Sequence, residues 1–95
     1  MLIHVMYTYM ENQKIYKTTD LHLQAFLRLM LPQSFTGADR SNGRVSFLFD
    51  NSDELQDLVR GYFTAQSYSL QPIQFATLIN QGKAIIFGKA VFDSA

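Results

Sequence analysis

The sequence predicts an α+β domain in which two or three helices cover one face of an antiparallel sheet of three or four strands. Three observations support this: an Asn-Gly turn between two strand-like segments, an amphipathic segment directly after them, and a strongly apolar helical segment before them. The expected order is β-β-α-β-β-α-α. The 95 residues should form one domain.

The central hairpin should turn at Asn42-Gly43. Both central residues of a type I′ turn need positive φ, which asparagine and glycine tolerate best. A two-residue loop pairs Ser41 with Arg44 and, further out, Thr36 with Phe49. On the second strand, one face is then apolar and has to be covered, because it carries Val45, Phe47 and Phe49.

A helix that covers this face should follow at once. Three consecutive residues are good N-caps, namely Asp50, Asn51 and Ser52. Asn51 also has Glu54 three positions on, which is capping-box spacing. Apolar residues then recur at i, i+3, i+4 and i+7, at Leu55, Leu58, Val59 and Tyr62.

Another helix is expected over residues 20–31. Thr18-Thr19-Asp20 predicts a threonine cap and an acidic first turn. The segment is apolar over most of its circumference, with Gln24 and Arg28 on a narrow solvent side, and Pro32 should end it.

The last helix should begin at Pro72, since proline suits the first position of a helix. Its apolar face would carry Phe75, Ala76, Leu78 and Ile79. Asn80-Gln81-Gly82 predicts its end. Residues 83–92 fit either a further helical turn with a tail or a late strand.

The first strand, residues 2–10, is apolar or aromatic on both sides, and it could form a hairpin with residues 14–17. Such a strand is buried on both faces or used in a subunit contact. A 95-residue chain also has a thin core that a dimer interface would extend. We therefore expect a homodimer or a protein partner, with a self-association surface at Leu2, Ile3, Val5, Tyr7 and Tyr9.

Composition excludes several function classes. Eight basic and eight acidic residues cancel, so no overall field attracts nucleic acid or an anionic membrane. The absence of cysteine excludes disulfides and thiolate sites, and is compatible with the cytoplasm. No apolar run reaches the roughly 18 residues of a membrane span, so no membrane partner is expected.

Nucleic-acid binding is the alternative function, through a basic hairpin tip. Arg40 and Arg44 flank the turn, and Lys14 and Lys17 should lie on a nearby strand. Asp39 and the neutral net charge would leave such binding weak and salt-sensitive, so solvated turn charges are the favoured interpretation.

No catalytic, metal or cofactor-binding residue is assigned. His4 and His22 lie on separate elements and lack metal-ligand spacing. The acidic residues near the helix that follows Ser52 are better explained by capping and the helix dipole than by a cation; they are Asp50, Asp53, Glu54 and Asp57. Without a nucleophile elbow or a phosphate-binding loop, we expect a non-catalytic protein.

Three segments of the chain carry a resemblance to a known family. They are residues 18–27, Arg44 to Leu55 and Leu58-Val59-Arg60-Gly61-Tyr62-Phe63. They resemble a family of short bacterial proteins known only as a domain of unknown function, with a "TTDLYLAAFL" opening, an "F-x-F" strand and a "YF" close. The resemblance covers about residues 15–80 and departs at residues 31–34, where members have a glycine-containing turn. It implies that residues 1–14 and 83–95 are peripheral additions to the family pattern. It implies a fold and no activity. The expected role is thus an interaction module of a bacterial cell or mobile element.

Overall fold

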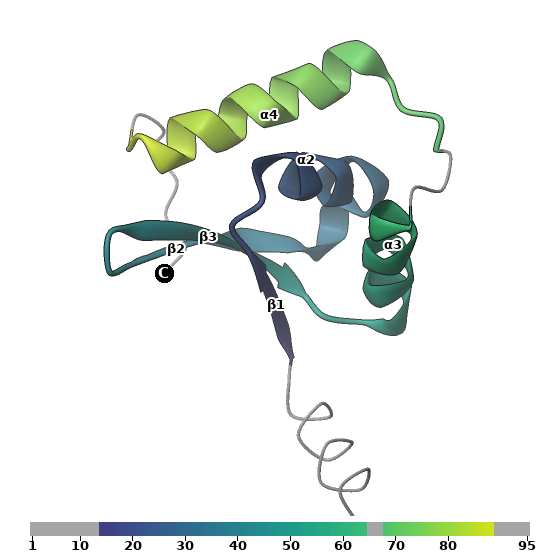
Figure 1. Ribbon diagram of the computed structural model, residues 1–95, viewed down its shortest axis with the longest axis horizontal. Helices are drawn as coiled ribbons and strands as arrows, with labels where there is room; N and C mark the ends of the chain where they lie inside the picture. The colour runs from purple at the N-terminus through teal and green to yellow at the C-terminus, as the bar shows by residue number, and fades with distance from the viewer. Residues whose placement is uncertain (1–13, 65–67, 89–95) are drawn as a thin grey trace, which may run out of the picture.

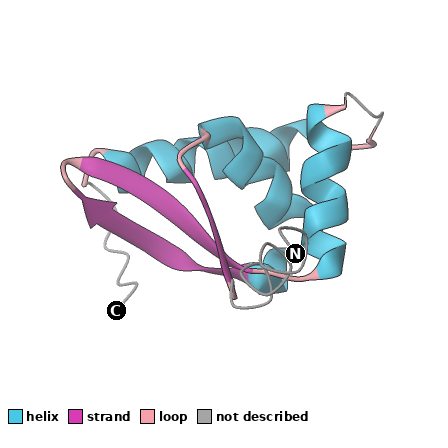
Figure 2. Cartoon of the chain, turned by 60° about the horizontal axis from the view of Figure 1, so that its bottom comes forward, coloured by secondary structure: helices cyan, strands magenta, loops and turns pink. Residues whose placement is uncertain are grey.

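The structure is a computed structural model that describes residues 14–64 and 68–88. It confirms the predicted α+β class. Within these residues, three antiparallel strands in the order β1-β3-β2 carry three helices on one face (Figures 1 and 2). The elements are β1 (Ile15–Thr18), α2 (Leu21–Met30), the 3₁₀ turn η1 (Pro32–Ser34), β2 (Phe35–Ser41), β3 (Arg44–Asp50), α3 (Asp53–Phe63) and α4 (Pro72–Ile86). The predicted first strand, residues 2–10, lies outside the described residues.

The hairpin turns where the sequence predicts. Asn42 and Gly43 have φ of 55° and 75°, as a type I′ turn requires, and Ser41 pairs with Arg44. The predicted pairing of Thr36 with Phe49 is wrong. Phe35 takes that position, because the register shifts between Phe35 and Gly37 and leaves Thr36 as an extra, bulged residue.

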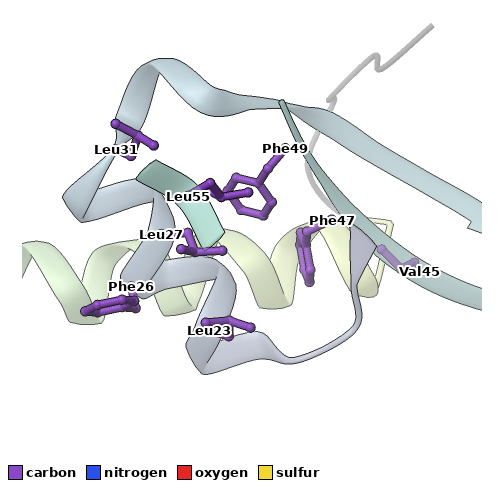
Figure 3. Packing of buried hydrophobic residues seen from close by; sticks show 8 residues of the cluster. All are labelled: Leu23, Phe26, Leu27, Leu31, Val45, Phe47, Phe49 and Leu55. Atoms are coloured by element: carbon purple, nitrogen blue, oxygen red, sulfur yellow. The ribbon is translucent and has the colours of Figure 1, made fainter. Parts of the chain in front are cut away.

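The core lies between β3 and the helices. Phe47 and Phe49 of β3 are fully buried and point towards α2 and α3 (Figure 3). Burial of each such ring contributes roughly 1.5–3 kcal/mol. Their neighbours in the cluster are chiefly leucines and one further phenylalanine of the helices, namely Leu23, Phe26, Leu27, Leu31 and Leu55. Of the predicted α3 stripe, Leu55 belongs to this cluster with Phe47 and Phe49, whereas Tyr62 packs on the Phe26 ring of α2, with the ring centres 5.2 Å apart.

The helix caps are set by single side chains. Of the three candidates before α3, Ser52 is the cap, and its Oγ accepts a hydrogen bond from the Leu55 amide at 3.1 Å. Before α2 the expected threonine cap is wrong, because the Asp20 carboxylate accepts from two amides, at His22 and Leu23. A carboxylate also interacts better than a hydroxyl with the positive end of the helix dipole.

α4 begins at Pro72 as predicted, but the predicted end at Gly82 is wrong. The helix continues to Ile86, so residues 83–86 are helical. The glycine that ends it is Gly88, with φ of 72°, whose amide donates to the Ile85 carbonyl at 3.1 Å. Gly82 is instead needed where α4 crosses α2, since a Cβ there would lie 2.6 Å from Gln24 Nε2.

The expected solvent side of α2 is covered by α4. Gln24 is fully buried, and its Nε2 donates to the Leu78 carbonyl at 3.0 Å. Arg28 is half-buried, donates to Gln81 Oε1 at 3.0 Å and lies 4.2 Å from the centre of the Phe35 ring. Burial lowers the pKa of Arg28. The prediction failed because α4 is more than fifty residues away in sequence.

The buried position of Gln24 allows a prediction of how a charge would affect the contact between α2 and α4. Gln24 Oε1 has no hydrogen-bond donor within the described residues. Gln24→Met should therefore change the free energy of unfolding by no more than about 1 kcal/mol, because one hydrogen bond is lost and one unpaired acceptor is removed. Gln24→Glu should cost at least about 3 kcal/mol, because it buries a carboxylate.

Urea unfolding followed by circular dichroism measures both changes. Gln74→Glu, at an exposed position of α4, is the matched control and should stay within about 0.5 kcal/mol. Equal effects of Gln24→Glu and Gln74→Glu would show that α4 does not cover α2 in solution.

Candidate interaction surface

α4 is the outermost layer of the molecule, and α2 lies between it and the sheet (Figure 1). It is the most apolar of the three described helices and has no acidic residue. Yet Gly82 is the only buried residue among Pro72–Ile86. An apolar helix in this position presents apolar surface to solvent.

The two sides of α4 differ in what they contact. The inner side packs on the core through partly buried side chains that include Phe75, Ile85 and Ile86. On the opposite side, Ile73 is 80% exposed and Phe87, which follows the last helical residue, is 70% exposed. We call this side the outer face of α4; it consists of Ile73, Ala76, Thr77, Asn80, Ala84 and Phe87.

Sequence reasoning missed this face. The apolar face predicted for the helix includes Ala76 but neither Ile73 nor Phe87. A signal was present in the sequence: residues 73, 80 and 87 are spaced by seven, which places them on one line along a helix. It was hidden by the expectation that the helix ends at Gly82.

Arg40 holds the C-terminal end of α4. Its Nη2 donates to the Ile86 carbonyl at 2.9 Å and to the Ile85 carbonyl at 3.3 Å. The Ile85 carbonyl also accepts from the Gly88 amide, so Arg40 is the second donor to Ile85. A cation at this end of the helix is favoured by the helix dipole. Arg40 lies opposite Val45 in the hairpin, so its side chain is on the face of the sheet that the helices cover.

The four predicted nucleic-acid contacts are not on one face of the sheet. Lys17 is opposite Leu48, on the face away from the helices, and its Nζ lies 3.9 Å from Asp39 Oδ2. Arg44 is exposed beside the turn, and Lys14 is exposed before β1. With Arg40 bound to α4, the hairpin does not present a joint basic patch. Nucleic-acid contact by these residues stays a prediction.

The predicted self-association residues lie outside the described residues: Leu2, Ile3, Val5, Tyr7 and Tyr9. His4 does as well. His22 is described and exposed, in the first turn of α2, where its backbone amide donates to Asp20.

The acidic residues near α3 serve the helix. Asp53 and Glu54 are in its first turn, and Asp57 forms an exposed ion pair with Arg60 at 2.7 Å. Within the described residues, no group of three or more acidic or histidine side chains is arranged to hold a metal ion.

A cleft of about 470 Å³ runs along α3. Tyr68 forms one side of it and is held by an edge contact with the Phe26 ring, with the ring centres 4.9 Å apart. The cleft combines apolar and charged side chains: Glu54, Asp57, Leu58, Arg60, Gly61, Thr64 and Tyr68. Two of its charges already pair with each other, so it offers a mixed surface without a chemical centre.

Two tyrosines lie near the Asp20 cap. Burial, and secondly the Asp20 charge, raise the pKa of Tyr16 above its ordinary value. The same two causes, in the same order, raise the pKa of Tyr62. The start of α2 is thus electrostatically coupled to β1 and α3.

Comparisons of the sequence with family models and curated proteins, and of the fold with solved structures, found no significant match. Within the part of the chain that the structure describes, no helix has the length and apolar character needed to cross a membrane.

Arg40 and Arg44 give a matched pair of substitutions. Arg40→Ala should lower the free energy of unfolding by about 1 kcal/mol, because the C-terminal end of α4 loses its cation and the Ile86 carbonyl loses the Arg40 donor. Arg44→Ala should stay within about 0.5 kcal/mol. Urea unfolding, with hydrogen exchange at the Phe87 and Gly88 amides, measures both effects. Equal effects of the two substitutions would contradict the role assigned to Arg40.

The two tyrosines predict a loss of stability in alkaline solution. Their pKa values are raised from 10.0 in the folded state, so the unfolded chain releases these protons first. Their contribution to stability is complete below about pH 10 and is lost as the pH rises through the folded-state pKa values.

The double variant Tyr16→Phe, Tyr62→Phe should flatten this alkaline loss. Urea unfolding at neutral pH and above about pH 10 measures it. Tyr68→Phe controls for removal of a tyrosine hydroxyl elsewhere. An undiminished alkaline loss in the double variant would refute the assignment.

Proposed function

We propose that this protein is a non-catalytic interaction module that acts by self-association. The observation that supports it is the outer face of α4, where Ile73 and Phe87 expose most of their side chains at the two ends of one helix. On the resemblance noted in the sequence, its setting is a bacterial cell or a mobile element, and the absence of cysteine is compatible with the cytoplasm.

Single exposed apolar side chains are normal on protein surfaces and need no explanation. Phe63 illustrates this, since it is exposed at the end of α3 and packs edge-on against the Tyr62 ring. Ile73 and Phe87 differ because they lie on the same face of an outermost helix whose only charged residue is Lys83. Depletion of charge together with aromatic or aliphatic anchors is typical of interface cores.

Self-association is favoured over a partner of another kind because of charge. α4 carries Lys83 as its only charged residue, and the whole chain has zero net charge. Copies of the chain therefore do not repel one another. Nothing on the outer face selects an acidic or basic partner.

Sedimentation velocity and light scattering test the proposal, with the full chain studied from micromolar to millimolar concentration at low and high salt. We expect a monomer–dimer equilibrium that salt changes little, because the buried surface is apolar. Ile73→Glu should weaken the dimer at least about tenfold.

Ile15→Glu is the matched control, since Ile15 is an exposed apolar residue on the sheet face away from the helices. It should leave the equilibrium unchanged. A chain that stays monomeric at millimolar concentration would overturn self-association as the function.

A further inference from the structure

We infer that two copies pair through α4 in an antiparallel arrangement about a two-fold axis at Asn80, so that Ile73 of each copy lies against the partner's Phe87. This deepens the proposed self-association and rests on it. It assigns the dimer contact to the outer face of α4 and states which residues of the two copies meet.

The outer face of α4 is symmetric about Asn80. Ile73 and Phe87 each lie seven residues from Asn80, which is roughly 10 Å along a helix axis at 1.5 Å per residue. Phe87 has φ of −86° and ψ of 4°, so it continues close to the helical path and stays in line with the other two. Both ends of the face are large and apolar.

Small side chains lie between these two ends. Ala76 and Ala84 are each four residues from Asn80, on either side of it. Thr77 adds a methyl group, because its hydroxyl donates to the Ile73 carbonyl at 2.9 Å and is satisfied within its own helix. Small side chains at the centre allow two helices to approach to the short end of the usual 8–10 Å separation.

A two-fold axis through Asn80 makes this face self-complementary. In such a contact, if residue i meets residue j of the partner, then j meets i of the partner. Ile73 then meets the partner's Phe87, and Ala76 meets the partner's Ala84. The large apolar ends thus pack on each other and the two alanines on each other, while Thr77 lies opposite the partner's Lys83, whose long side chain keeps its charge in water.

Asn80 sits on the axis and faces the partner's Asn80. A side-chain amide carries both a donor and an acceptor, so two facing amides can satisfy each other. A single polar residue at the centre of an otherwise apolar helix seam fixes the register at some cost in stability.

Charge favours the antiparallel arrangement over the parallel one. The cations near α4 gather at its C-terminal end, where Lys83 is on the helix and Arg40 holds the last carbonyls. Parallel helices would bring these cations together with those of the partner. Antiparallel helices separate them and place opposite ends of the two helix dipoles side by side.

The contact should be weak. A helix of 15 residues is roughly 22 Å long, so a contact between one pair of helices is short compared with specific interfaces, which bury more than about 1,000 Å². We therefore expect dissociation in the micromolar range or above.

Single cysteine variants test the register, because the chain has no cysteine of its own. Asn80→Cys should form a disulfide-linked dimer under mild oxidation, since the two thiols meet at the axis. Ile73→Cys and Phe87→Cys should each link poorly alone, and should link readily to each other when the two variants are mixed. Ile15→Cys is the control for random collision.

Thiols held together in a dimer have an effective concentration of millimolar order, against micromolar for random encounter, so we expect linkage on the order of 1,000-fold faster than for Ile15→Cys. Asn80 is exposed on α4, so its replacement should leave the fold intact, which urea unfolding verifies.

The outcomes separate this inference from the proposed function. A dimer in sedimentation whose Asn80→Cys variant links no faster than Ile15→Cys would overturn the α4 contact and leave self-association standing. Deletion of residues 2–9 would then test the first strand. Rapid self-linkage of Ile73→Cys alone would indicate parallel helices and also overturn the inference. A monomer at all concentrations would overturn both.

Discussion

The close approach of α4 to α2 at Gly82 is the constraint on which the outer half of the molecule depends. A Cβ at this position would lie within 3 Å of both Gln24 Nε2 and Leu21 Cδ1. Without a side chain at residue 82, the two helices come near enough for Gln24 to reach the backbone of α4 at Leu78. A glycine inside a helix costs about 1 kcal/mol relative to alanine, so its use here is explained by packing and not by helix formation.

Polar contacts then orient α4 on the layer beneath it. Gln24 is bound near its centre, Arg28 binds Gln81, and Arg40 holds its C-terminal carbonyls. Each contact joins α4 to a different place, on α2 or on the hairpin. Partly buried aliphatic side chains supply the area, but they would tolerate rotation of the helix about its axis. The polar contacts fix that rotation, and thereby determine that Ile73, Asn80 and Phe87 point away from the core.

The features predictable from sequence are those decided within a few residues. The turn at Asn42-Gly43, the alternation of β3 and the helix starts near Ser52 and Pro72 are set by local backbone preferences. The features that sequence reasoning got wrong depend on distant partners. Gln24 was expected in solvent, but a helix from the far end of the chain covers it. The bulge at Thr36 follows from pairing with β3 and has no local signal beyond Gly37.

The same distinction explains why the candidate surface was recognised only in the structure. A helix whose apolar residues surround its axis is one that is covered on more than one side. The α4 sequence has this character, with Phe75, Leu78 and Ile85 on one side and Ile73, Ala76 and Phe87 on the other. From sequence alone the two sides merge into one apolar segment, and a glycine in its middle indicates an end. The structure assigns the first side to the core and leaves the second without a covering layer within the described residues. The α4 sequence is that of a helix covered on two sides, and the described residues cover one of them. In the proposed dimer, the second copy of the chain covers the other side.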